Sequence, residues 1–96
     1  MPIGSFSDVA TEEFFVLGKT KRRVSWQAIG SIITRKLDML NYATLLTDLR
    51  SPPGNRLEAL KGNLLGYHSI RVNDQWRVVF RWTPSGPIEV KICDYH

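Results

Sequence analysis

The chain has 96 residues, of which 43% are hydrophobic and 23% are charged. This length suits one domain and leaves no room for a second core, and the composition excludes a disordered chain. Thirteen Lys and Arg against nine Asp and Glu give a formal net charge of +4, which favours phosphate-bearing partners without identifying one. We therefore expect residues 1–96 to form a single basic globular domain.

The first half of the chain is predicted to be helical. A first helix should begin within SDVATEEFF, with Ser7 or Asp8 as its cap and two glutamates near its positive end. A second helix should begin at Ser25 as its cap, because apolar residues recur there every three or four positions. These residues form one stripe that should be buried: Ile29, Ile32, Ile33, Leu37 and Leu40. The basic run KTKRR between the helices is interpreted as a solvated loop.

The second half is predicted to be a β-meander. Pro52, Pro53 and Gly54 should forbid a regular element and produce a surface loop, and the LEAL that follows is ambiguous. YHSIRVN and WRVVFRW are rich in β-branched and aromatic residues, and the polar residues 73–75 between them indicate a hairpin. TPSGP then predicts a turn into a last strand, IEVKICDYH.

These elements predict an α+β fold, in which two N-terminal helices pack on one face of a small, mainly antiparallel sheet of three or four strands. Along WRVVFRW, the alternate side chains that begin at Trp76 should face the helices. The other set, Arg77, Val79 and Arg81, should lie on an exposed face. The two arginines there are either solvated residues of a strand edge or part of a surface for a phosphate-bearing ligand.

The compartment is predicted from the first residues and from the cysteine content. The start MPIGSFSDVATEEF has neither a basic head nor an apolar signal core, and no apolar run is long enough to cross a membrane. Cys93 is the only cysteine, so it cannot form an intramolecular disulfide, and we expect a small buried residue there. The protein is therefore predicted to be cytoplasmic, without membrane contact.

Residues 48–82, DLRSPPGNRLEALKGNLLGYHSIRVNDQWRVVFRW, together with the terminal DYH, resemble the HigB family of bacterial toxins within the RelE/ParE superfamily. The helical stretch RKLDMLNYAT adds a weaker match. The resemblance implies ribosome-dependent cleavage of mRNA and no cofactor. It also implies a cognate HigA-like antitoxin with a helix-turn-helix domain, through which the complex would bind its own promoter DNA.

The residues tied to activity in that family carry over as Lys61 of LKG, Arg77 of DQWR and the terminal His96, which Asp94 and Tyr95 precede. The chemistry fits these residue types. Cleavage of RNA without a metal needs proton transfer and stabilisation of the phosphorane charge. Histidine exchanges a proton near neutral pH, and the two cations can stabilise the charge. Which residue is the acid and which the base stays open.

Several neighbouring residues are assigned supporting roles with alternatives. Tyr95 would either stack on an unpaired base or lie half-buried beside the sheet, and Arg81 would contact RNA. Some relatives carry a histidine at the position of Glu58, so Glu58 is either dispensable or holds Lys61. His68 is interpreted as a packing or surface residue. Two histidines and one scattered cysteine do not make a metal-ligand set, so no metal is expected.

Two other functions remain open on the sequence alone. A ParE-like gyrase poison of the same fold would lack the catalytic set, so the joint presence of Lys61, Arg77 and His96 argues against it. A non-catalytic module that only binds its regulator would also have a basic surface. The net charge therefore does not separate that module from a nuclease.

Overall fold

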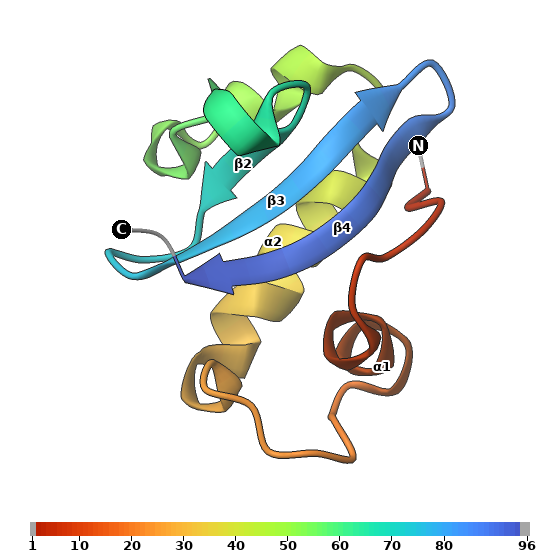
Figure 1. Ribbon diagram of the computed structural model, residues 1–96, viewed down its shortest axis with the longest axis vertical. Coiled ribbons are helices and arrows are strands. Elements are labelled where there is room, and N and C mark those ends of the chain that lie inside the picture. Colours follow the sequence, from red (N-terminus) through yellow and green to blue (C-terminus); the bar gives the residue numbers. More distant parts are fainter. Residues whose placement is uncertain (1, 95–96) are drawn as a thin grey trace.

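Two α-helices and a four-stranded sheet make up the fold that the computed structural model describes for residues 2–94 (Figure 1). The helices come first, and short 3₁₀ turns connect the elements. In chain order the elements are α1 Val9–Leu17, η1 Gln27–Ile29, α2 Gly30–Tyr42, η2 Leu46–Arg50, η3 Pro53–Asn55, β1 Glu58–Ala59, η4 Gly62–Leu64, β2 His68–Arg71, β3 Trp76–Thr83 and β4 Gly86–Asp94. The predicted α+β class, with the helices before the sheet, is confirmed.

The first helix begins where the sequence predicts it. The Asp8 carboxylate accepts a hydrogen bond from the backbone N–H of Thr11 at 2.7 Å, which makes Asp8 the N-cap. Gly18 ends the helix with φ at 77°, a left-handed conformation that glycine adopts without a steric penalty. Thr11 is fully buried and accepts a hydrogen bond from the backbone N–H of Ile92 at 3.3 Å. This contact holds α1 against the outer edge of β4.

The second helix begins later than predicted, so the assignment of Ser25 as its cap is wrong. The segment before Gly30 instead forms a turn and η1, in which Trp26 is buried edge-on against the ring of Phe14. Gly30 lies so close to that ring that an added Cβ would come within 3.0 Å of it. Burial of Trp26 thus sets the helix start, because it holds this segment out of the α-helical conformation.

The apolar stripe of α2 is confirmed. Ile33, Leu37 and Leu40 are fully buried, and Ile29 and Ile32 pack against the same core from its margin. Figure 1 shows α2 crossing behind β3 and β4. The helix therefore covers one face of the sheet and forms the main core with it.

The sheet is antiparallel with the order β1-β2-β3-β4. The predicted hairpin between β2 and β3 is confirmed, and the Asn73 side chain closes it by accepting hydrogen bonds from the N–H groups of Gln75 and Trp76. The ambiguous LEAL contains the short edge strand β1, which pairs with β2. At the opposite edge, Phe6 forms a parallel bridge with Val90, so the N-terminal segment covers part of β4.

The loop after α2 is more ordered than the prediction of an irregular surface loop, which is wrong in this respect. It contains η2 and η3, and it buries Leu49 and Asn55 completely. The Asn55 amide donates hydrogen bonds to the carbonyl oxygens of Leu49 at 3.1 Å and Ser51 at 3.3 Å. The prolines do not prevent this, because a helical turn accepts proline at its first position.

Two smaller predictions, for the basic loop and for His68, are confirmed, whereas Cys93 was expected to be buried and is only partly so. All four basic residues of the loop after α1 are exposed: Lys19, Lys21, Arg22 and Arg23. The ring of His68 stacks on Phe80 with the ring centroids 6.2 Å apart, which is a packing role. Cys93 is half-buried, and burial raises the pKa of its thiol. Within residues 2–94 no helix has both the length and the apolar character that crossing a membrane requires.

Candidate active site

The face of the sheet that points away from α2 is rich in cations. Strand pairing places Arg71, Arg77 and Cys93 in one row across the sheet, and Ser69, Val79 and Lys91 in the next row. Side chains paired in this way lie on the same face. Arg81 follows Val79 by two positions, although a bulge interrupts the pairing between them. We call Arg71, Arg77, Arg81 and Lys91 the basic face.

Arg77 is buried on this face, which corrects the expectation that it is exposed. Only 6% of the residue is accessible, and its neighbour in the next row, Val79, is 1% accessible. The guanidinium donates hydrogen bonds from Nε to the Ser69 hydroxyl and from Nη2 to the Arg56 carbonyl, each at 2.7 Å. The side chain is buried because residues from the β1 segment and from β2 surround it. The guanidinium is therefore held in one orientation.

Glu58 connects Arg77 with the segment that carries Lys61. Its carboxylate lies 3.6 Å from Nη2 of Arg77, and it also lines a hollow of about 370 Å³ beside Lys61. Lys61 itself is exposed and directly precedes η4. Besides the two roles that the sequence leaves open for Glu58, the structure shows a third. In the part of the chain that it describes, the Glu58 carboxylate pairs with Arg77.

The loop before β1 presents the carbonyl that receives Arg77. Asn55 is fully buried and, besides the two carbonyls it binds, accepts a hydrogen bond from the Lys36 ammonium. The following residue, Arg56, has φ at 46°, which turns its carbonyl toward Nη2 of Arg77. Asn55 therefore positions Arg77 through Arg56. Burial, with Arg35 and Arg71 nearby, lowers the pKa of Lys36.

Arg81 lies at the other end of the basic face. Its guanidinium stacks over the ring of Tyr67, 4.9 Å from the centroid, and the Tyr67 hydroxyl donates a hydrogen bond to the Glu89 carboxylate at 2.6 Å. Gly66 also approaches the guanidinium, because an added Cβ there would lie 3.2 Å from Nη2. Arg81 is half-buried rather than fully exposed.

Sequence reasoning missed Ser69, the Arg56 carbonyl and the Tyr67–Glu89 pair. The alternation in HSIR, applied as it was to WRVVFRW, would have found Ser69 and Arg71 on the basic face. No pattern in the sequence indicates that the backbone of Arg56 reaches Arg77, since 21 positions separate the two residues.

Asp94 ends β4 close to Arg77. It pairs with Trp76, the residue before Arg77, and its carboxylate accepts a hydrogen bond from the Gln75 side chain at 3.0 Å. Tyr95 and His96, which the sequence assigns to base contact and catalysis, lie outside the described residues. Within residues 2–94, no three His, Cys, Asp or Glu side chains gather in a way that could hold a metal ion.

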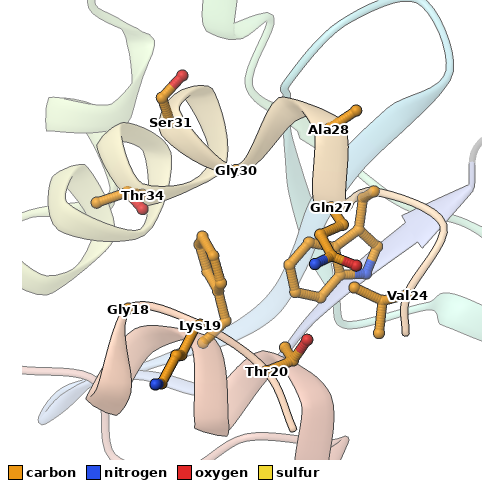
Figure 2. A pocket seen from close by; sticks show the side chains of 11 residues that line it. Gly18, Lys19, Thr20, Val24, Gln27, Ala28, Gly30, Ser31 and Thr34 are labelled. Atoms are coloured by element: carbon orange, nitrogen blue, oxygen red, sulfur yellow. The ribbon is translucent and has the colours of Figure 1, made fainter. Parts of the chain in front are cut away.

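A hollow of about 520 Å³ lies far along the chain from these residues (Figure 2). Its walls are the end of α1, the loop that follows and the start of α2, with the aromatic rings of Phe14 and Trp26 inside. Neither Lys61 nor Arg77 lines it. Its size alone therefore does not make it the active site.

The fold is that of the YoeB and ParE toxins. A structure titled "The structure of YoeB dimer from Staphylococcus aureus" matches the whole chain with a TM-score of 0.56 at 24% identity, over 97% of its own length. One titled "YoeB/ParE toxin from Agrobacterium tumefaciens" matches with a TM-score of 0.54 at 23% identity, over 99% of its length. These identities establish the likeness of fold.

Sequence relatives identify the family within that fold. The family model of the RelE-like toxin HigB of type II toxin–antitoxin systems matches residues 4–96. "Toxin HigB-1" of Vibrio cholerae is 46% identical over 77 residues, which are 80% of each chain. An uncharacterized protein of Haemophilus influenzae is 35% identical over 77 residues, 80% of this chain and 75% of its own. The chain belongs to the HigB family.

Family membership establishes the general activity and one partner. The chain is the toxin of a type II toxin–antitoxin system, and endoribonuclease activity is that of the RelE-like toxins. Its partner is an antitoxin. A solved complex of the same fold, "YoeB-YefM complex from Staphylococcus aureus", matches with a TM-score of 0.55 at 20% identity, covering all of this chain and 99% of that one.

Proposed function

We propose that this toxin cleaves mRNA on the ribosome without a metal ion, and that Lys61, Arg77 and His96 are its catalytic residues. One observation carries most of the support. Glu58 lies 3.6 Å from Arg77 and lines the same hollow as Lys61, so the segments that carry the two cations meet. His96 follows Asp94 by two positions, and the strand of Asp94 is paired with that of Arg77.

The reaction has three tasks for these residues. The 2′-hydroxyl of a nucleotide loses its proton, its oxygen forms a bond to the adjacent phosphorus, and the bond from phosphorus to the 5′-oxygen breaks. The departing 5′-oxygen takes up a proton, so the products are a 2′,3′-cyclic phosphate and a 5′-hydroxyl, and the three tasks are proton removal, charge stabilisation and protonation of the leaving oxygen. His96 transfers a proton, which contributes about 10²–10⁴-fold in rate. Lys61 and Arg77 stabilise the negative charge that grows on the phosphorane oxygens.

The burial of Arg77 suits it to this task. A guanidinium that is already oriented by Ser69 and the Arg56 carbonyl needs no rearrangement when charge develops on the substrate. The pairing with Glu58 adds a further constraint on its orientation. Lysine at this position would have neither the planar fork of donors nor the same fixed geometry.

The rest of the basic face would bind the RNA backbone. Arg81 is held against Tyr67 and is a candidate contact for a phosphate or a base. Tyr95 would stack on an unpaired base, and Asp94 would support the end of the chain that carries His96. Binding that depends on such phosphate contacts weakens steeply as the salt concentration rises.

The proposal includes the partners and the compartment. The ribosome holds the mRNA in line for attack, which supplies part of the rate enhancement through orientation. The antitoxin is HigA-like, with a helix-turn-helix domain, and the toxin reaches promoter DNA only through it. The toxin acts in the cytoplasm, where translation occurs.

Replacement of His96 is the first test. His96→Ala, expressed without antitoxin, should no longer arrest growth, whereas His68→Phe, which keeps an aromatic ring on Phe80, should remain toxic. Both variants are compared at equal expression. Full toxicity of His96→Ala would contradict the assignment of His96 to catalysis.

Assays with purified components test whether cleavage depends on the ribosome and whether it needs a metal ion. Cleavage of an mRNA should be fast in programmed ribosomes and slow with the same RNA free in solution. A phosphorothioate at the scissile non-bridging oxygens should slow cleavage equally in Mg²⁺ and in Mn²⁺, because no metal contacts those oxygens. Rescue of the sulfur-substituted substrate by Mn²⁺ would overturn metal independence, and equal rates with free RNA would overturn ribosome dependence.

A further inference from the structure

We propose that the outer face of α1 is a docking site for a basic, amphipathic segment of the antitoxin. This face consists of Val9, Glu12, Glu13, Val16 and Leu17, and we call it the α1 patch. The proposal uses the established antitoxin partner and is independent of the proposed cleavage mechanism.

The α1 patch exposes an unusual amount of apolar surface. Val9, Val16 and Leu17 are 55%, 68% and 52% accessible, and they are half of the large hydrophobic residues that are exposed within residues 2–94. Val9 and Val16 are seven positions apart, which is two helical turns or about 10 Å along one face. The opposite side of α1 packs against the core through Ala10, Phe14 and Phe15. A short helix with apolar side chains on both sides is typically covered by other parts of a protein on both sides.

The α1 patch also carries negative charge in a basic chain. Glu12 is exposed between the two valines, and Glu13 is paired with Arg22 at 3.4 Å. The paired oxygen of Glu13, Oε1, is buried beside Arg22, so Glu12 is the carboxylate of the α1 patch that is open to solvent. A partner segment with apolar side chains flanked by lysine or arginine would complement both properties of this surface.

The charge decides between the possible occupants. RNA phosphates would be repelled by the exposed carboxylate of Glu12, whereas Glu13 is already paired with Arg22, so the α1 patch is not an extension of the basic face. A second copy of the chain would, in a two-fold dimer, bring this acidic surface against itself. With RNA and a second copy excluded, the antitoxin is the established macromolecular partner that remains. The antitoxin segment that binds the α1 patch must then be basic and amphipathic.

The position of α1 makes the α1 patch separate from the candidate active site. The helix is held at the outer edge of β4 by the bond between Thr11 and Ile92. Glu58 and the segment of Lys61 lie at the opposite edge, where β1 ends the sheet. An antitoxin segment on α1 would therefore leave the hollow beside Lys61 uncovered.

The apolar part is tested with Val16→Ser/Leu17→Ser. The purified variant should bind the cognate antitoxin at least about tenfold more weakly than the wild-type toxin. The matched control is Tyr42→Ser/Leu45→Ser, which removes two exposed apolar side chains at and just after the end of α2 and should change affinity less than about threefold. Thermal unfolding confirms that both variants are folded. Wild-type affinity in the α1 variant would overturn the proposal.

The charged part is tested with Glu12→Lys, with Asp38→Lys on α2 as the control. Glu12→Lys should weaken antitoxin binding by about fivefold or more at low salt, and Asp38→Lys should not. Unchanged or tighter binding by Glu12→Lys would overturn a basic occupant. In sedimentation experiments, the wild-type toxin and Val16→Ser/Leu17→Ser should have the same oligomeric state. Conversion of a wild-type dimer to a monomer would overturn the antitoxin as occupant.

Growth experiments separate this proposal from the cleavage mechanism. Val16→Ser/Leu17→Ser should arrest growth as the wild-type toxin does, and co-expressed antitoxin should rescue it less well than it rescues the wild type. Full rescue would contradict docking on α1. If the proposed cleavage mechanism is wrong, the His96 and Arg77 variants will remain toxic. Their antitoxin binding should be normal in either case.

Discussion

Val78 and Val79 are neighbours on β3 and are equally buried, at 0% and 1% accessibility, yet they lie in different surroundings. Val78 belongs to the apolar core between the sheet and α2. Val79 lies on the opposite face, in the row of Ser69 and Lys91 and next to the row of Arg77. Burial on one face comes from apolar packing, and on the other it accompanies hydrogen-bonded polar side chains. The first arrangement stabilises the fold, whereas the second holds the candidate catalytic arginine.

The largest effect is expected from Arg77→Lys. Lysine cannot bind Ser69 and the Arg56 carbonyl as a fork, so cleavage on the ribosome should fall by about 10²-fold or more. Arg71→Lys is the control, because Arg71 pairs directly with Arg77 across the strands and is bound to the exposed Asp74 instead. Single-turnover rates measure both. Equal losses in the two variants would mean that the basic face acts only as a diffuse charge.

The two valines test the comparison directly, since the truncation is the same on each face. Val78→Ala should cost about 2–3 kcal/mol, because α2 and the sheet cannot close around the cavity. Val79→Ala should cost about 1–2 kcal/mol, the transfer free energy of the lost methyl groups, because a polar layer relaxes more readily. Urea unfolding gives both values. A larger cost for Val79→Ala would show that the basic face is the more rigid of the two.

Asn55→Ala should lower both stability and activity. Its loss leaves the buried carbonyl of Leu49 and the partly buried carbonyl of Ser51 without their donor, at a cost of about 1–3 kcal/mol. It also releases the Arg56 carbonyl that orients Arg77, so cleavage should fall even where the variant is fully folded. Asn63→Ala, at an exposed site, is the control for both measurements. Normal cleavage by folded Asn55→Ala would show that Asn55 is not needed to position Arg77 for catalysis.

The smallest effect is expected at Asp48 and depends on pH. The backbone N–H groups of Leu45 and Thr44 donate to its carboxylate and lower its pKa. A carboxyl with a lowered pKa in the folded state stabilises the fold above its unfolded pKa, and this contribution is lost as the pH falls through the folded pKa. Asp48→Asn should therefore be less stable than wild type at pH 7, with the difference vanishing in acid. Urea unfolding at several pH values measures the difference in unfolding free energy between the two proteins. A difference that grows on acidification would contradict this prediction.

The elements that sequence reasoning predicted correctly depend on neighbours close in the chain. The stripe of α2, the capping of α1 by Asp8 and the hairpin at Asn73 follow from period, cap and turn residues within a few positions of one another. The predictions that were wrong depend on distant contacts. Trp26 and Phe14 displace the start of α2, and Asn55 turns a proline-rich loop into a buried support.

The candidate site divides in the same way. Lys61, Arg77 and His96 were chosen from motifs, and those motifs also indicated the HigB family that the comparisons establish. The burial of Arg77, its pairing with Glu58 and the stacking of Arg81 on Tyr67 were not predicted. Each of them joins residues that lie far apart in the chain, so each depends on the tertiary packing around β3.

The sequence by itself determined which side chains are available and that two helices precede the strands β2, β3 and β4, because propensity, capping and alternation act over a few residues. Only the tertiary structure decided that Arg77 is held rather than solvated, because the groups that bind it come from Arg56 and Ser69. A strand's alternation predicts on which face a side chain lies. What covers that face is decided by chain segments that reach it from elsewhere in the fold.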